Sequence, residues 1–171
     1  MQRRLPLVFS SLALTALALA SPAPGEERPY SAQPFPGPRG EVLLPSGTVL
    51  QVELADTPAK MAMGYMFRDV VTDGEGMVFF HQDTGFHSFW MKNCRVSLDL
   101  VWMDENWNIV HVERNVPPCR QDPCPSYVPM RASRYVLEVQ AGMAGRHNLI
   151  PGSRIIYNAP RPEAPELRDR Q

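Results

Sequence analysis

The stretch GFHSFWMKNCRVSLDLVWMD (residues 85–104) decides the fold of this 171-residue chain, because it places charged side chains inside a strongly apolar segment. A strand is predicted over 97–103; one face holds Leu98, Leu100 and Trp102, and the other holds Asp99, Val101 and Met103. A strand that is apolar on both faces is covered on both, which leaves Asp99 little contact with water. Because an unpaired buried charge costs several kcal/mol, Asp99 must be paired or must have a function.

Two interpretations of Asp99 follow if the segment forms a hairpin. In the first, Asp99 forms a structural ion pair with Lys92, or with a nearby arginine, and the pair fixes the register of the strands. In the second, both residues converge with Asn93 and Trp90 on a pocket, because polar groups among apolar walls are typical of ligand sites. The predicted ligand-binding residues are Arg68, Trp90, Lys92, Asn93 and Asp99.

The two ends of the chain are predicted to lie outside the folded domain. Residues 1–20 have the basic start, short apolar run and small-residue end of a cleaved export signal, and the run is shorter than the roughly 20 residues that cross a membrane. Residues 21–39 form a proline-rich linker and residues 159–171 a disordered charged tail. We therefore expect one exported domain over 40–158, periplasmic or secreted, without stable membrane insertion after cleavage.

The charge balance excludes nucleic acid as a partner. The chain has 17 Lys and Arg against 18 Asp and Glu, and two of the arginines, Arg3 and Arg4, lie in the predicted signal. Phosphate binding needs a basic surface, which this balance does not supply. We expect a small polar ligand or a protein of the cell envelope as the partner instead.

Strands joined by short polar turns make up most of the predicted domain. The clearest is 48–55, with the two-residue period of a half-buried strand, and others are expected over 41–44, 76–80, 86–92, 97–103, 108–114, 135–141 and 154–157. Asp56 and Pro58 begin a short helix that ends at Gly64. The pattern predicts a mainly β fold, a compact antiparallel β-sandwich or jelly-roll-like barrel with one or two short helices.

Because disulfides persist in oxidising compartments, the predicted export makes a disulfide between two of the three cysteines an expected feature. Cys119 and Cys124 lie in one proline-rich loop, and a disulfide between them is favoured over a pairing with Cys94. Closing so short a loop stabilises the fold by about 2 kcal/mol. Redox catalysis is not favoured, because four intervening residues do not make a Cys-x-x-Cys arrangement. Cys94 is then free.

A series of short motifs resembles the signature of the bacterial and archaeal family called domain of unknown function 192. The matching motifs include Gly64-Tyr65-Met66-Phe67-Arg68, Gly76-Met77-Val78-Phe79, Phe89-Trp90-Met91-Lys92-Asn93, Leu98-Asp99, Pro118-Cys119, Cys124-Pro125 and Val136-Leu137-Glu138. The resemblance covers most of 49–156 and implies a jelly-roll sandwich with a short helix, typically exported and without established activity. The family usually has threonine or serine where Cys94 stands, which argues against a catalytic role for this thiol.

No motif of a familiar enzyme is present in the sequence. The four histidines form no paired zinc spacing, and there is neither a Gly-x-Ser-x-Gly elbow nor a glycine-rich phosphate loop. Catalysis is therefore not favoured, and no cofactor is predicted. The leading hypothesis is a binding module for a small polar ligand, sugar-like or carboxylated, or for an envelope protein.

A first alternative is copper binding in the cell envelope. Met61, Met63 and Met66 resemble the thioether clusters that hold Cu(I), and a histidine (His81 or His87) or Cys94 would complete the site. The opposing interpretation is that these flexible side chains fill the core and that Met61 and Met63 point to different sides.

A second alternative is a hydrolase of envelope glycans. Alternation puts Glu53 and Glu138 on the solvated side of their strands, where they would form a catalytic pair with Asp99 or Glu113 if the carboxyl groups came within about 5 to 9 Å.

Overall fold

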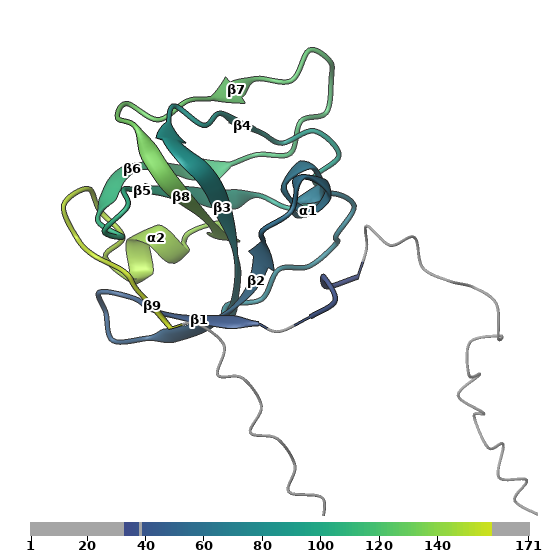
Figure 1. The fold of residues 1–171 in the computed structure, drawn as a ribbon. Helices are drawn as coiled ribbons and strands as arrows, with labels where there is room; N and C mark the ends of the chain where they lie inside the picture. The colour runs from purple at the N-terminus through teal and green to yellow at the C-terminus, as the bar shows by residue number, and fades with distance from the viewer. Residues whose placement is uncertain (1–32, 38, 159–171) are drawn as a thin grey trace, which may run out of the picture.

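The computed structural model describes residues 33–37 and 39–158, which form a curled seven-stranded sheet and a two-stranded ribbon (Figure 1). The sheet has the order β6-β5-β8-β3-β2-β1-β9, and the ribbon pairs β4 with β7. The strands are β1 (Gly40–Leu43), β2 (Val49–Ala55), β3 (Glu75–Gly85), β4 (Phe89–Trp90), β5 (Leu98–Met103), β6 (Ile109–Val116), β7 (Ser126–Tyr127), β8 (Ser133–Gln140) and β9 (Ile156–Asn158). The helices are α1 (Pro58–Met63) and α2 (Met143–Arg146).

The predicted mainly β fold with one or two short helices is confirmed, and every predicted strand has a counterpart in the structure. The prediction missed β7 and α2, which have two and four residues and are too short for a periodic pattern. All strand pairs are antiparallel except β2 with β3. A parallel pair needs a crossover connection, and here the crossover contains α1.

The helix α1 begins and ends as its sequence dictates. The hydroxyl of Thr57 caps the first turn by accepting a hydrogen bond from the Lys60 N–H, and Pro58 occupies the first turn, where its missing N–H is harmless. Gly64 ends the helix with a φ of 48°, a conformation that favours glycine. The chain therefore turns sharply at Gly64 and enters the segment Tyr65 to Arg68.

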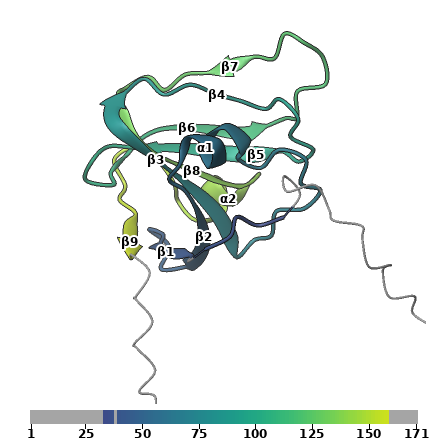
Figure 2. The ribbon, with the colours of Figure 1, turned by 45° about the vertical axis from the view of Figure 1, so that its right-hand side comes forward.

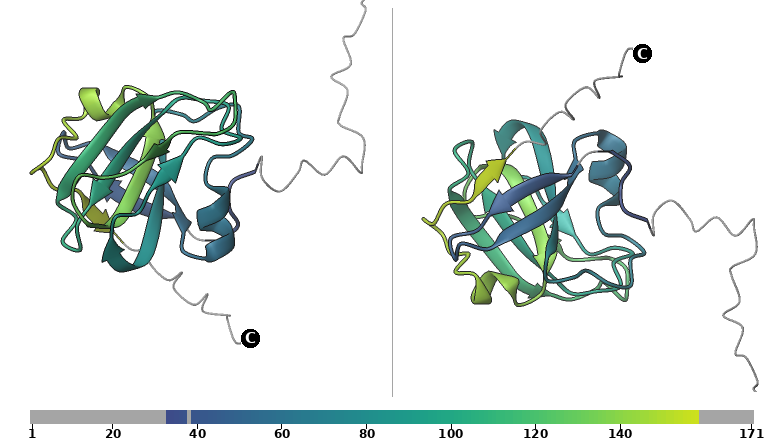
Figure 3. Two further views of the ribbon diagram at one scale, coloured as in Figure 1. Left: turned by 90° about the horizontal axis from the view of Figure 1, so that it is seen from above. Right: turned by 90° about the horizontal axis from the view of Figure 1, so that it is seen from below.

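Both faces of the sheet are covered, so the domain has two hydrophobic cores. We call the first the α2 core; its members include Val78, Val101, Leu137, Met143 and Ala144. We call the second the α1 core; it lies under α1 and the β4–β7 ribbon and includes Met77, Phe79, Leu100, Trp102 and Val136. Figures 2 and 3 show the two helices on different sides of the curled sheet. All six residues of β5 are buried, as its apolar sequence predicted.

The N-terminal linker differs from its prediction at Phe35. The predicted signal (1–20) and tail (159–171) lie outside the described residues, as does most of the predicted linker (21–39). Within the linker, however, Phe35 is 6% exposed and belongs to the α1 core, and its backbone N–H donates to Glu53 Oε2 at 2.8 Å. Part of the predicted linker is therefore core. In the described part of the chain, no helix has the length and apolarity to cross a membrane.

Candidate ligand-binding pocket

Asp99 is fully buried, but its charge is compensated by the backbone. The Asn115 N–H donates to Asp99 Oδ1 and the Ala144 N–H donates to Asp99 Oδ2, both at 2.7 Å. Hydrogen bonds to a charged acceptor are short and strong, and two of them can replace a cation. Asp99 therefore ties β5 to the first turn of α2 and to the end of β6. This role is structural.

Lys92 does not pair with Asp99, which corrects the first interpretation of the hairpin. By strand alternation Asp99 faces the α2 core, whereas Lys92 follows β4, whose Phe89 packs on the α1 core across the sheet. Lys92 Nζ instead lies 3.4 Å from an oxygen of Asp122 and 5.6 Å from the centre of the Trp90 ring. The five predicted ligand residues therefore do not converge on Asp99.

Asn93 contacts the segment that follows α1. It has a φ of 59°, and its carbonyl accepts a hydrogen bond from the Phe67 N–H at 2.8 Å. Its side-chain nitrogen lies 3.8 Å from the Met66 sulfur. Asn93 thus joins the turn after β4 to the segment after α1. The ligand-binding role predicted for Asn93 and Lys92 stays a prediction.

Arg68 is 8% exposed and forms a buried ion pair with Glu53. Both guanidinium Nη atoms donate to the carboxylate, the second at 2.8 Å, and the rings of Phe35 and Tyr65 lie 5.4 and 4.9 Å from the guanidinium carbon. Burial alone would lower the pKa of Arg68, but hydrogen bonding to Glu53 and its charge raise it above the ordinary value. The expectation that Glu53 is solvated is wrong, because Phe35 and Arg68 cover that side of β2.

Glu138 is the second carboxyl group that alternation placed on a solvated face, and it is also buried, with 4% of its surface exposed. It lies at the centre of the sheet on β8, opposite Met77 of β3 and Leu100 of β5. Oε2 of Glu138 is buried and has no hydrogen-bond partner in the described part of the chain. The sheet thus holds a carboxyl group in its interior without a cation and without a donor to that oxygen.

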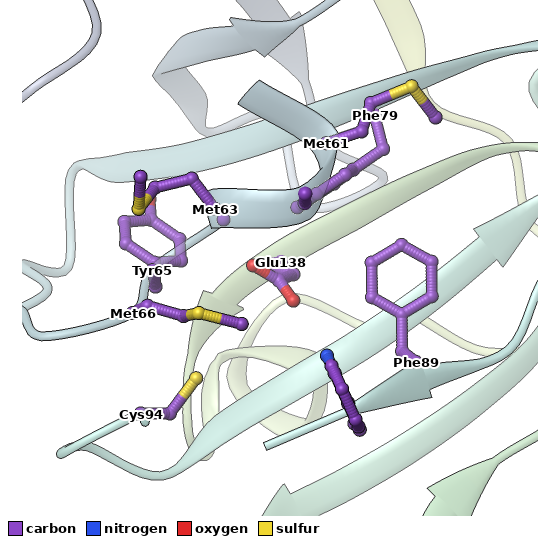
Figure 4. Close-up of a pocket in the computed structure, with 11 residues that line it drawn as sticks. Met61, Met63, Tyr65, Met66, Phe79, Phe89, Cys94 and Glu138 are labelled. Atoms are coloured by element: carbon purple, nitrogen blue, oxygen red, sulfur yellow. The ribbon is translucent and has the colours of Figure 1, made fainter. Parts of the chain in front are cut away.

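A pocket opens onto this carboxyl group between α1, the centre of the sheet and β4. Figure 4 shows the Glu138 carboxyl group among the lining side chains, with Met66 and Cys94 on one side and Phe89 on the other. The lining residues are Met61, Ala62, Met63, Gly64, Tyr65, Met66, Phe79, Phe89, Trp90, Cys94 and Glu138. The enclosed space amounts to about 30 Å³, far below the roughly 300 to 1,000 Å³ of drug-sized sites.

Burial sets the electrostatics of the pocket. Loss of hydration raises the pKa of Glu138 to about 8, against a weaker opposing effect of the Arg68 charge. Burial, and next the charge of Glu138, raise the pKa of the Cys94 thiol to about 12. Burial also raises the pKa of Tyr65, and the carboxylates of Glu53 and Glu138 add to it. At neutral pH the pocket therefore presents a neutral carboxyl group, a neutral thiol and a neutral phenol.

Gly64 gives the carboxyl group its space. A Cβ atom at this position would lie 3.6 Å from Glu138 Oε2 and 3.3 Å from Cζ of Phe79, and the φ of 48° disfavours any side chain. The turn that ends α1 therefore also keeps the floor of the pocket open.

The family model of DUF192, described as an uncharacterized ACR, matches residues 42–157, which is more than half of the chain. The chain belongs to the DUF192 family. No curated protein matches the sequence of this DUF192 chain.

Two solved structures resemble the DUF192 domain. One is a protein of unknown function from Novosphingobium aromaticivorans, with a TM-score of 0.63, 26% identity and coverage of 77% of this chain and 99% of that one. The other is a proposed transcription regulator from Sinorhizobium meliloti, with a TM-score of 0.60, 29% identity and coverage of 70% of this chain and 92% of that one.

Of the five predicted ligand residues, only Trp90 lines the pocket of the DUF192 domain. Arg68 lines a neighbouring hollow with Glu53, and the Tyr65 ring belongs to both. Sequence reasoning missed Glu138 as a central group, although its motif, Val136-Leu137-Glu138, was part of the family resemblance. The sequence did contain one indication of its importance, because Glu138 stands between the apolar residues Leu137 and Val139. Both of these are buried in the structure.

The predicted disulfide between Cys119 and Cys124 is present in the structure, and Cys94 is free. The disulfide closes the loop that leads to β7 and so lies next to the ribbon that carries Trp90. The cluster of Cys119, Asp122 and Cys124 has the spacing of a metal site, but the disulfide uses both sulfur atoms. In this DUF192 chain the loop is covalently fixed.

Proposed function

We propose that this protein is a binding module for a small ligand, held in the pocket of Glu138. The observation that carries the proposal is the buried Glu138 carboxyl group, whose Oε2 has no partner in the described residues and which lines an open pocket. The export predicted from residues 1–20 would place this module in the cell envelope or outside the cell.

The state of Glu138 favours a binding role over a structural one. An unpaired buried polar group destabilises a fold by about 1 to 3 kcal/mol, and nearly all such groups in native proteins have partners. Asp99, on the same sheet, shows how this chain pairs a structural carboxylate, with two backbone donors. Glu138 lacks such donors at Oε2 but has a cavity beside it, which is the arrangement expected when a ligand completes the hydrogen bonding.

The walls of the pocket suit a small, partly apolar ligand. Aromatic and thioether side chains supply most of the lining, and one polar group lies at the floor. Ligand sites commonly combine apolar walls with a few polar groups that set orientation. Trp90 of β4 is 51% exposed, so a ligand can reach its ring without a rearrangement of the protein. The size of the space favours a compact molecule over the sugar-like ligand expected from the sequence.

The hydrolase alternative finds less support in this geometry. Glu53 and Glu138 lie two strands apart on one face, about 10 Å at the usual strand spacing, near the upper end of the range of inverting glycosidases. Glu53, however, is held by both Nη atoms of Arg68 and by the Phe35 N–H. Asp99 faces the other core. Neither Glu53 nor Asp99 is therefore free to activate a water molecule beside Glu138.

The copper alternative needs sulfur atoms that converge. Met61, Met63 and Met66 all line the pocket, but Figure 4 shows the sulfur atoms of Met61 and Met63 pointing away from Glu138 to opposite sides. His81 and His87 stack on each other, with ring centres 3.6 Å apart, and neither lines the pocket. We therefore propose a ligand other than copper.

The test is a fragment screen by NMR on the full chain with ¹³C-labelled methionine methyl groups. The signal of Met66, assigned with Met66→Leu, reports on the pocket, and we expect saturable shifts with small fragments that carry a hydrogen-bonding group. Trp90→Ala should weaken this binding at least fivefold, because it removes an exposed wall of the pocket without touching the core.

A glycine pair provides the matched control for the screen. Gly64→Ala adds a methyl group at the floor of the pocket, 3.3 Å from Cζ of Phe79 and 3.6 Å from Glu138 Oε2, and should weaken binding. Gly47→Ala, at a φ of 86° with open space around it, introduces a comparable backbone strain far from the pocket and should bind normally. The proposal fails if no fragment shifts Met66, or if Trp90→Ala and a folded Gly64→Ala bind as the wild type does.

A further inference from the structure

We propose that the ligand of the Glu138 pocket is a small organic cation of the ammonium class, paired with the Glu138 carboxylate and surrounded by the aromatic rings. This inference rests on the proposed function and names the chemistry of its ligand.

The charges around the pocket favour a cation. Glu138 is the one carboxylic acid among the lining residues, and the lining contains no lysine, arginine or histidine. The nearest guanidinium, that of Arg68, is occupied by Glu53 in a buried pair. An anionic ligand would meet a carboxyl group without a free cation to bind it, whereas a cationic ligand would convert Glu138 into half of an ion pair.

The rings around the pocket already attract cations within this molecule. Lys92 Nζ lies 5.6 Å from the centre of the Trp90 ring, and the guanidinium carbon of Arg68 lies 4.9 Å from the centre of the Tyr65 ring. Both rings also line the pocket, together with Phe79 and Phe89, which meet edge to face at 4.8 Å. Aromatic walls around one acid are the usual means of holding an alkylated ammonium ion.

The lining argues against metal cations of the hard class. Calcium takes six to eight oxygen ligands and magnesium demands about six in octahedral geometry. In this pocket the side-chain oxygen atoms belong to Glu138 and Tyr65, and the other side chains offer carbon, sulfur and the indole N–H of Trp90, which is a donor and not a metal ligand. An alkylammonium ion needs one counter-charge and apolar contact for its methyl groups, and the pocket supplies both.

Binding of such a cation is coupled to loss of one proton. The empty pocket holds Glu138 as the neutral acid, because its pKa is about 8. The cation binds the carboxylate, so one proton leaves Glu138 for solvent as one positive charge enters.

The groups that face Glu138 are Tyr65, Arg68 and Cys94, and the carboxylates of Glu53 and Glu75 act through Tyr65 and Arg68. On the flanking strands its neighbours, Met77 and Leu100, do not titrate. Tyr65 and Cys94 remain neutral up to pH 9 because burial raises the pKa of each. The pH dependence of binding between pH 7 and 9 therefore reports on Glu138.

The experiment compares three probes of similar shape on the full chain, read at the Met66 methyl signal with sodium chloride as the control for ionic strength. The probes are tetramethylammonium chloride, neutral tert-butanol and anionic pivalate. We expect tetramethylammonium to bind at least tenfold more tightly than tert-butanol and pivalate not to bind. Its permanent charge leaves only the protein to titrate, so a Glu138 pKa of about 8 should tighten binding about tenfold from pH 7 to pH 9.

Glu138→Gln tests the role of the carboxylate without changing the shape of the pocket, and it should fold because Glu138 is already neutral at pH 7. We expect at least tenfold weaker binding of tetramethylammonium at pH 9 and no pH dependence. Glu105→Gln, in an exposed turn, is the matched control and should behave as the wild type does.

Three results would overturn the inference. If tert-butanol or pivalate binds as tightly as tetramethylammonium, the cation class is wrong while the proposed function stands. If tetramethylammonium binds Glu138→Gln at pH 9 as tightly as it binds the wild type, the Glu138 carboxylate is not its partner and the inference is wrong. If no probe or fragment shifts Met66, the proposed function fails with the inference.

Discussion

Glu53 and Glu138 lie in one row across the sheet with Met77 between them, yet the chain treats the two carboxyl groups in opposite ways. Glu53 has a guanidinium and a backbone N–H as partners, so its charge is compensated. Glu138 has neither at Oε2 and faces a cavity. The first glutamate fixes the segment Tyr65 to Arg68 against the sheet, and this segment then forms a wall over the second.

Replacement of Glu138 by glutamine should change how stability depends on pH. Burial raises the pKa of Glu138 from 4.5 to about 8, so between these values the folded state binds more protons than the unfolded state. The free energy of unfolding of the wild type should therefore fall as the pH rises from about 5 to 8, by at most about 1.4 kcal/mol per unit of the shift. Below and above this window the contribution is constant.

Urea denaturation of the wild type and Glu138→Gln at pH 5, 7 and 9 measures this effect. The variant should be close to the wild type at pH 5 and the more stable of the two at pH 9. Equal pH profiles in both proteins would show that Glu138 titrates normally.

Arg68→Met should destabilise the fold by about 3 to 5 kcal/mol, because it leaves the buried Glu53 carboxylate without its cation. A second change, Glu53→Gln, should restore much of that loss, since a neutral amide no longer needs a counter-charge. A double-mutant cycle in urea separates the pair from its surroundings. Additive effects of the two changes would contradict a coupled pair.

Asp99→Asn should cost about 3 kcal/mol or more in unfolding free energy, although it preserves shape. The new amide side chain would have one acceptor oxygen for two buried N–H donors, those of Asn115 and Ala144, and its NH₂ group would oppose one of them. Glu105→Gln is the control in an exposed turn. A stable Asp99→Asn that loses tetramethylammonium binding would return Asp99 to the ligand site and refute the structural role.

The paired change Cys119→Ser with Cys124→Ser should lower the unfolding free energy by about 2 kcal/mol, the chain-entropy value for so short a loop. Cys94→Ser, which breaks no bond, serves as the comparison, and mass spectrometry of unreduced peptides verifies the pairing. A disulfide that includes Cys94 in those peptides would contradict the structure.

The sequence predicted the strands well because alternation is a local property that each strand carries in its own residues. It predicted the burial of Asp99 for the same reason. It did not predict the partners of Asp99, because backbone N–H groups of Asn115 and Ala144 have no signature in a sequence and depend on how β6 and α2 are placed. From the sequence, the only partner that could be suggested for Asp99 was a lysine or arginine side chain.

Glu53 and Glu138 were misjudged for a related reason. A two-residue period separates the faces of a strand, but it does not say whether the polar face meets water. Here the sheet curls and both faces are covered, one by α1, the ribbon and Phe35. A pattern typical of a half-exposed strand therefore belongs to strands in which the glutamates on the polar face are buried. The candidate site lies on that face, which is why its central residue was not found.

The pairing of β1 with β9 places the beginning of the domain beside its end, with Glu41 opposite Asn158. The two ends of the domain are therefore close enough to be joined, and the position of the chain termini can be moved elsewhere. A short peptide that joins residue 158 to residue 40 would allow new termini in the exposed turn at residues 105–106. Such a circular permutant would keep every strand pair but would lose Phe35 and its hydrogen bond to Glu53.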